Sequence, residues 1–254
     1  LRALRVLGLH SNDLSALPEQ VTRLPCLEEL WVEDNQLAGL PESFSRLRTL
    51  KRLNAEGNVM REFPEPVCAI EGLEGLRLAG NMLSDVSDSI GRLTCLKGLD
   101  LSRNRLKRLP DAFCQLSRLE WLGLSGNNLT GLPSPAGRLR SLNMLYASVP
   151  HDAIAQQVPE LGKLYASASL PAAVGKLQSL RTLDLRDNLL RELPEVVCTL
   201  SALEDLWLDG NMLSTLPGSL GQLRSLRVLG VNRNHLQALG NLEVGMLSEL
   251  RELQ

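Results

Sequence analysis

The chain has 254 residues, of which 44% are hydrophobic and 22% are charged, and its formal net charge is −2. The near balance of 27 basic and 29 acidic residues argues against a general nucleic-acid binder, which normally carries a basic excess. No apolar run approaches the roughly 20 residues that a membrane-spanning helix needs. We therefore expect neither a nucleic-acid partner nor a membrane span.

A sequence motif of twenty-three residues repeats along almost the whole chain, and each complete copy contains an Asn at the same position. Around each Asn the sequence approximates Leu-x-x-Leu-x-Leu-x-x-Asn-x-Leu-x-x-Leu-Pro, which has the consensus and the period of the leucine-rich repeat. Each repeat of such a solenoid packs only against its neighbours, so residues 1–254 are expected to form a single elongated domain. The marking residues are Asn12, Asn35, Asn58, Asn81, Asn104, Asn127, Asn188, Asn211 and Asn234.

The first half of each repeat predicts a short strand, because Leu-x-Leu alternates between an inward and an outward side chain. Strands of successive repeats would pair in parallel and form one curved sheet. The Asn that follows is a polar residue among apolar neighbours. We expect its amide to bond backbone groups of its own turn and of the adjacent repeat, since buried amides need partners.

The second half of each repeat, for example residues 109–116, predicts a short helix or helical turn that begins at a Pro. We therefore expect an α/β leucine-rich repeat solenoid, a horseshoe of about eleven repeats with a parallel concave sheet and short convex helices. The residues expected on the inward face of the helical segments are Phe44, Ile90, Phe113, Val174, Val197 and Leu220.

The period breaks once, between Leu142 and Leu180, which are 38 residues apart. The sequence Leu-Tyr-Ala-Ser occurs at residues 145–148 and again at residues 164–167, nineteen positions later. Residues 142–179 are therefore interpreted as an irregular pair of short repeats. The alternative is one repeat that carries an insertion of fifteen residues.

Both ends of the chain are expected to be uncapped. Leu1 would close a preceding repeat, and Leu250 and Leu253 would open a further one. Terminal repeats of a solenoid need a polar outer face, so the chain is interpreted as a fragment of a longer protein.

Five cysteines occupy two recurring positions of the repeat and are expected to be small, buried, reduced thiols. Cys68 and Cys114 stand two repeats apart, or about 10 Å at the spacing of neighbouring strands. A disulfide needs Cα atoms within about 7 Å. The sequence has no Cys-x-x-Cys pair, so we expect no metal site. An odd number of free thiols favours a reducing compartment.

The full repeat motif, with its Leu-Pro before the helical segment, resembles the intracellular Ras-group class of leucine-rich repeats. Residues 203–213 and 231–236 are similar to repeats of Scribble-type scaffolds, Ras-suppressor proteins and plant intracellular Ras-group proteins. The resemblance implies a cytoplasmic horseshoe that binds a protein on its concave sheet, and it carries over no catalytic residues. Val86-Ser87 and Leu239-Gly240 depart from the pattern, because they lack the Pro.

The three Trp and two Tyr residues are expected at outward strand positions, which line the concave face. Trp and Tyr are enriched at protein-binding hot spots, although they also suit exposed strand positions without any partner. Adjacent repeats place Trp121 beside Met144, so their side chains should touch and form the best candidate cluster. The candidate aromatic and apolar contacts are Trp31, Trp121, Met144, Tyr146, Tyr165 and Trp207.

Charged residues on the same face alternate in sign along the solenoid. Acidic groups surround Trp31 and Trp207, and a basic stretch lies between them. This alternation could steer a partner of complementary charge, or it could be an ordinary solvated surface. The candidate charged contacts are Glu29, Glu33, Arg52, Arg77, Asp205 and Asp209.

The sequence offers no catalytic constellation. His10, His151 and His235 are far apart, and the Gly-Asn pairs belong to the repeat turn rather than to a phosphate loop. We expect no enzyme, no cofactor and no metal, and we predict a non-enzymatic protein–protein interaction module. The alternatives are a regulatory or sensing segment of a larger kinase- or GTPase-type enzyme, and a structural subunit of a large assembly.

Overall fold

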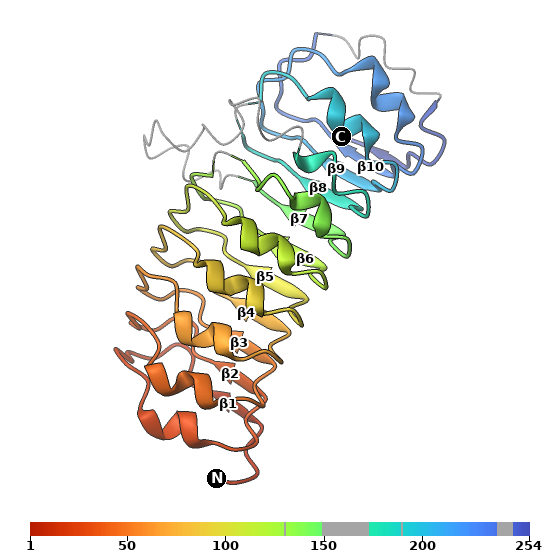
Figure 1. Cartoon of the computed structure of the whole chain (residues 1–254). Helices are drawn as coiled ribbons and strands as arrows, with labels where there is room; N and C mark the ends of the chain where they lie inside the picture. The colour runs from red at the N-terminus through yellow and green to blue at the C-terminus, as the bar shows by residue number, and fades with distance from the viewer. Residues whose placement is uncertain (130, 149–172, 189, 238–245) are drawn as a thin grey trace.

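The computed structural model describes residues 1–129, 131–148, 173–188, 190–237 and 246–254. It contains one sheet of eleven parallel strands in chain order, and Figure 1 shows the repeats stacked side by side. This confirms the predicted solenoid. The strands are β1 (Val6–Gly8), β2 (Glu29–Trp31), β3 (Arg52–Asn54), β4 (Gly75–Arg77), β5 (Gly98–Asp100), β6 (Trp121–Gly123), β7 (Met144–Tyr146), β8 (Thr182–Asp184), β9 (Asp205–Trp207), β10 (Val228–Gly230) and β11 (Glu252–Leu253).

The predicted helical segments are short 3₁₀ helices that form a row along the other side of the solenoid (Figure 1). Most begin directly after a Pro, which stands at the N-cap rather than at the first helical position. Ser87 replaces that Pro once, and its hydroxyl accepts a hydrogen bond from the Ser89 backbone N–H at 3.0 Å. The helices are η1 (Glu19–Arg23), η2 (Glu42–Arg46), η3 (Glu65–Ala69), η4 (Asp88–Arg92), η5 (Asp111–Gln115), η6 (Ala136–Arg138), η8 (Glu195–Thr199) and η9 (Gly218–Gln222).

The core lies between the sheet and the 3₁₀ helices, and the repeated leucines fill it. The middle residue of each strand from β2 to β10 is a Leu that is at most 2% exposed. The six residues predicted on the inward face of the helical segments are all buried as well. Among the described residues, no helix is long and apolar enough to cross a membrane. Each buried side chain of this size stabilises the fold by about 2 kcal/mol.

The repeated Asn residues form a hydrogen-bonded ladder, as predicted. The Asn104 side chain donates to the carbonyl oxygens of Leu101 in its own turn and of Leu78 in the preceding repeat, at 3.0 and 2.9 Å. Its Oδ1 accepts the backbone N–H of Leu83 at 2.9 Å. Across the irregular segment, Asn188 donates to Ala147, forty-one residues earlier, at 3.2 Å. From Asn35 onward, each amide therefore ties one repeat to the one before it, whereas Asn12 in the first repeat donates only within its own turn.

The residue before each ladder Asn adopts a left-handed backbone conformation. Four of these positions hold Gly, and the other five hold larger residues, including Arg103 with a φ of 55°. A side chain in this conformation costs about 1 to 2 kcal/mol, because Cβ approaches the following carbonyl oxygen. The nine residues are Ser11, Asp34, Gly57, Gly80, Arg103, Gly126, Asp187, Gly210 and Arg233.

We expect Arg103→Gly to stabilise the protein, by about 0.5 to 1 kcal/mol, since glycine adopts this conformation without strain. Urea unfolding monitored by circular dichroism measures the change. Arg105→Gly is the matched control, because Arg105 is also exposed but has no left-handed backbone. The control should be destabilised by a similar amount, and the same sign of change in both variants would contradict the prediction.

The cysteines divide into two groups. Cys68, Cys114 and Cys198 are buried free thiols, as predicted. The expectation of burial is wrong for Cys26, which is exposed, and for Cys95, which is half-buried. These two stand just outside the first Leu of the next repeat, where the returning chain reaches the surface. Burial raises the pKa of Cys68 to about 12 and that of Cys114 to about 11.

Iodoacetamide at pH 8 should therefore alkylate Cys26 and leave Cys68 and Cys114 unmodified in the folded protein. The thiolate is the reactive form, and a thiol with a pKa near 12 is ionised in only about one molecule in ten thousand at this pH. Intact and peptide mass spectrometry measures the modification at each site. Unfolding in urea should expose every thiol to the reagent. Labelling of Cys68 in the folded protein as fast as Cys26 would contradict this prediction.

The irregular segment joins two strands that are paired to each other. Met144 in β7 lies opposite Thr182 in β8, and Leu145 lies opposite Leu183. Direct pairing of β7 with β8 fits one repeat that carries an insertion, and it gives no support to the interpretation as two short repeats. Residues 149–172 lie outside the described residues, and the candidate contact Tyr165 lies among them.

Candidate functional site

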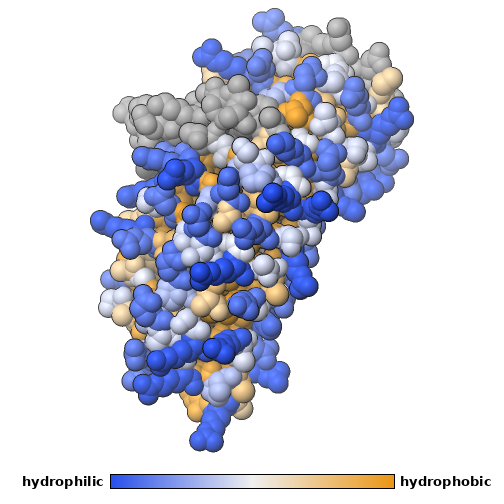
Figure 2. All heavy atoms as spheres, in the orientation of Figure 1, coloured by the Kyte–Doolittle hydropathy of each residue, from blue (hydrophilic) through white to orange (hydrophobic). Residues whose placement is uncertain are grey.

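The concave face of the sheet consists of the residues that flank the buried middle Leu of each strand, together with the second residue after each strand. In β2, β7 and β9 the flanking residues are half-buried on both sides of a buried Leu. The strands from β2 to β10 are each paired on two sides, so their backbone groups are already bonded. A partner on this face would therefore contact side chains. Figure 2, which has the orientation of Figure 1 and is not a direct view of the concave sheet, shows a mostly hydrophilic surface with some hydrophobic residues exposed.

The predicted aromatic cluster is present at β6 and β7. The ring centroids of Trp121 and Tyr146 are 6.1 Å apart, and the ring planes are tilted by 55°. Met144 lies opposite Trp121 in the strand register, and its sulfur is 3.7 Å from the Tyr146 hydroxyl. Tilted aromatic pairs at this separation contribute about 0.5 to 1.5 kcal/mol beyond their burial. The cluster is thus a preformed, half-buried apolar surface.

A hollow of about 330 Å³ lies beside this cluster, over β3, β4 and β5. Trp31 and Trp121 line it, and so does the backbone of Gly75 and Gly98. This hollow was not predicted from the sequence. The first residues of β3, β4, β5 and β6 are Arg52, Gly75, Gly98 and Trp121, and they lie next to one another in the sheet. The two successive glycines are the feature of the sequence that indicates the hollow.

The charged residues around the hollow are linked between repeats. Arg52 pairs with Glu29, and the Lys97 ammonium donates to Glu74 at 2.9 Å. The hydrogen bond from Lys97, together with the positive charges of Lys97, Lys51 and Arg52, lowers the pKa of Glu74 despite its partial desolvation. Arg77 also lines the hollow and is exposed. Among the residues that line the hollow, Glu74 therefore faces three cationic side chains.

A second cluster occupies the concave face at β8 and β9, and only its Trp207 was predicted as a contact from the sequence. The Arg186 guanidinium donates two hydrogen bonds to Asp184, at 2.8 and 3.0 Å, and lies 5.5 Å from the ring centroid of Trp207. Asp184 is 2% exposed. The hydrogen bond to Asp184 raises the pKa of Arg186. Arg186 therefore covers Trp207, which makes this indole less available to a partner than Trp121.

The remaining predicted acidic contacts are partly used by the fold. Asp205 accepts the Thr182 hydroxyl at 3.1 Å. Asp209 is only 6% exposed, and its Oδ1 accepts the backbone N–H of Asn232 at 2.9 Å, so it belongs to the turn more than to the open surface. One carboxylate oxygen of Asp209 and one of Glu33 are buried without a hydrogen-bond partner among the described residues.

Comparison with known proteins agrees with this architecture. Residues 71–129 match the family described as leucine rich repeat, and residues 165–254 match the family described as leucine-rich repeat region. The chain therefore has the leucine-rich repeat fold, and two stretches of it match leucine-rich repeat family models. No curated protein matches the sequence.

Solved leucine-rich repeat structures share the fold. A leucine-rich repeat protein of Leptospira interrogans is 29% identical, with a TM-score of 0.63, over 100% of this chain and 72% of that one. The plant peptide hormone receptor RGFR1, in complex with RGF2, is 28% identical, with a TM-score of 0.67, over 98% of this chain and 43% of that one. TLR13, in complex with ssRNA13, is 27% identical, with a TM-score of 0.79, over 100% of this chain and 36% of that one.

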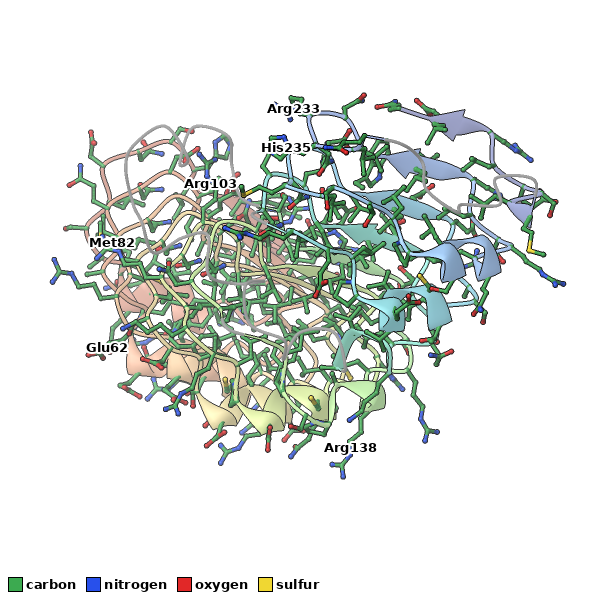
Figure 3. All side chains as sticks on the ribbon, turned by 90° about the horizontal axis from the view of Figure 1, so that it is seen from above. Glu62, Met82, Arg103, Arg138, Arg233 and His235 are labelled. Carbon is green, nitrogen blue, oxygen red and sulfur yellow. The ribbon has the colours of Figure 1, made fainter. Side chains whose placement is uncertain are left out.

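The strands and the 3₁₀ helices of the repeats lie on opposite sides of the solenoid and give it two different surfaces. The candidate aromatic and charged side chains line the sheet, whereas the 3₁₀ helices expose polar residues such as Glu42 and Arg46. In Figure 3, Arg138 projects from the row of 3₁₀ helices, whereas Arg233 and His235 project from the other side of the solenoid.

Proposed function

We propose that this leucine-rich repeat domain is a non-enzymatic module that binds a partner protein on its concave face. The contact between Trp121 and Tyr146 carries the proposal, because it places two large, rigid, half-buried rings together on a surface of otherwise scarce aromatics. Rings of this kind lose little conformational entropy when a partner covers them, and they dominate many protein interfaces. Met144 extends the apolar surface at its edge.

A nucleic-acid partner is disfavoured by charge. The net charge of the chain is −2, and carboxylates such as Glu29, Glu33 and Glu74 are spread along the concave face. A phosphate backbone that followed the sheet would meet these carboxylates in several repeats, and this repulsion would offset the attraction of the arginines. A protein partner can instead place opposite charges separately.

A second candidate function is a sensing or regulatory segment of a longer protein, such as a kinase- or GTPase-type enzyme. The observation that favours it is coverage, because the chain spans only 43% of RGFR1 and 36% of TLR13, whose structures contain bound ligands. In this candidate the concave face would still bind the ligand, and an attached domain would respond to it. A structural subunit of a large assembly remains the third alternative.

We also propose the intracellular Ras-group subclass and a reducing, cytoplasmic location. The Leu-Pro wording that precedes most of the 3₁₀ helices supports the subclass. The five free cysteines support the compartment, because secreted domains commonly pair their thiols. Expression of the full-length gene with a fluorescent tag tests the location.

The function is tested by replacing both rings of the aromatic pair. The Trp121→Ala/Tyr146→Ala variant should lose at least about 100-fold in affinity for proteins that the wild-type domain retains from a lysate of its source cells. Its fold should persist, since both side chains are only half-buried. Quantitative mass spectrometry of the retained proteins and a circular dichroism melt provide the two measurements.

The matched control for this experiment removes two exposed apolar side chains outside the strands. Val59→Ala/Met212→Ala serves this purpose, because Val59 and Met212 are each 37% exposed. The control should retain the same proteins as the wild type. Equal retention by the Trp121→Ala/Tyr146→Ala variant would show that the partner binds elsewhere.

A further inference from the structure

The hollow on the concave face exists because of two glycines that the fold does not require. A Cβ atom at Gly98 would lie 3.6 Å from the nearest Trp121 ring carbon, and one at Gly75 would lie 3.7 Å from Arg52 Cγ, which are ordinary contacts. Neither glycine has a left-handed backbone. Gly123 differs, because a Cβ there would lie 2.5 Å from an Asp100 carboxylate oxygen. Packing therefore explains Gly123 but leaves Gly75 and Gly98 unexplained.

The walls of the hollow suit a large apolar side chain. Trp31 and Trp121 line it from opposite ends, and its volume of about 330 Å³ is comparable to that of small ligand pockets, which begin at about 300 Å³. Trp121 also contacts Tyr146, so the hollow and the aromatic cluster form one continuous surface. A segment lying along the concave face can reach both.

The rim of the hollow suits carboxylates. Three lining residues are cationic and one, Glu74, is anionic. Lys97 and Arg52 each have a carboxylate neighbour, whereas Arg77 lies in no ion pair within the described part of the chain. An Arg guanidinium binds a carboxylate through two parallel hydrogen bonds, so Arg77 is the natural anchor for one.

We propose that this hollow seats an extended segment of a partner protein in which a large apolar side chain is flanked by Asp or Glu. The apolar side chain enters between Trp31 and Trp121 above Gly75 and Gly98, and a flanking carboxylate binds Arg77. The backbone groups of β3, β4 and β5 are already paired, so the segment is recognised through its side chains. This proposal rests on concave-face binding and names the chemistry of the partner.

The probe is a library of random linear peptides displayed on phage, selected against the wild-type domain. The enriched peptides should share an aromatic or large aliphatic residue next to Asp or Glu. A synthetic peptide of that sequence is then titrated against the variants by fluorescence anisotropy. Gly98→Leu fills the hollow and should weaken binding at least 10-fold. Gly39→Leu is the matched control, because Gly39 lies outside the strands and a Cβ there would meet nothing within 4 Å.

Charge reversal provides an independent variant that leaves the hollow open. Arg77→Glu should weaken peptide binding at least 10-fold, and this loss should diminish for a peptide whose Asp or Glu is replaced by Asn or Gln. Arg105→Glu is the matched control, since Arg105 is exposed and lies outside the strands. Circular dichroism melts confirm that each variant is folded.

Several results would overturn this proposal. These are a selection that enriches no peptide, enrichment of Lys- and Arg-rich peptides, wild-type affinity in both Gly98→Leu and Arg77→Glu, or displacement of the selected peptide by single-stranded RNA oligonucleotides. If Trp121→Ala/Tyr146→Ala abolishes partner retention while Gly98→Leu and Arg77→Glu preserve it, the hollow proposal is wrong and the proposed function stands. If all of these variants retain the partner, both are wrong.

Discussion

Asn104→Ala should lower the free energy of unfolding by about 3 kcal/mol, because it leaves several buried backbone groups without partners. The lost amide bonds the carbonyl oxygens of Leu78 and Leu101 and the N–H of Leu83. Asn104 is 6% exposed, so water cannot easily replace its side chain. Urea unfolding followed by circular dichroism at equilibrium measures the effect.

The same substitution in the first repeat is the matched control. Asn12 is exposed, and its side chain donates only within its own turn, to Leu9 and His10. We expect Asn12→Ala to cost less than about 1 kcal/mol, since water can reach the groups it leaves. Equal destabilisation by both substitutions would mean that the bonds between repeats contribute little, and that the ladder acts only within each turn.

Leu99→Ala should lower the free energy of unfolding by about 3 to 4 kcal/mol. Leu99 is the middle residue of β5 and is fully buried. The repeats before and after it hold their own leucines at the same level, Leu76 and Leu122, so the stack cannot close around the missing side chain without moving them. The loss therefore includes both transfer of the side chain and a residual cavity.

Leu7→Ala is the control for this prediction. Leu7 occupies the same place in β1 but is only half-buried. Its truncation should cost about 1 to 2 kcal/mol, because less apolar area is returned to water. Chemical denaturation of both variants under identical conditions provides the comparison. A cost at Leu7 equal to that at Leu99 would contradict the account of the core.

The fold was predictable because one period fixes the environment of many residues at once. Once Asn104 and Leu99 are assigned to a position in the repeat, the same assignment applies to Asn81, Leu76 and every other copy. The predicted ladder, sheet and core follow from that register, and so does the placement of Trp121 opposite Met144. The 3₁₀ form of the short helices was not specified, since a five-residue segment satisfies both helix types about equally.

The irregular segment shows that local sequence similarity does not determine strand pairing. The echo of residues 145–148 at 164–167 favoured two short repeats. The sheet pairs Leu145 directly with Leu183, and the ladder resumes from Asn188 to Ala147. Thirty-eight residues between equivalent positions thus correspond to a single step in the sheet.

The hollow could not be predicted from large side chains, because it forms where two strand positions have no side chain. Gly75 and Gly98 carry no chemistry of their own, and they matter only as neighbours in adjacent strands. Their signal in the sequence is that two successive repeats carry Gly at the same strand position. Arg186 was overlooked for a similar reason, since its contacts with Asp184 and Trp207 join residues of two repeats.

Binding of a partner through the concave face is tested most directly by fluorine NMR of the domain labelled with 5-fluorotryptophan. The chain has only three tryptophans, so Trp31, Trp121 and Trp207 give one resonance each, assigned by single Trp→Phe variants. Addition of a retained partner should shift or broaden the Trp121 resonance most, because that indole contacts Tyr146 and lines the hollow. Saturation with the partner while all three resonances stay unchanged would contradict concave-face binding.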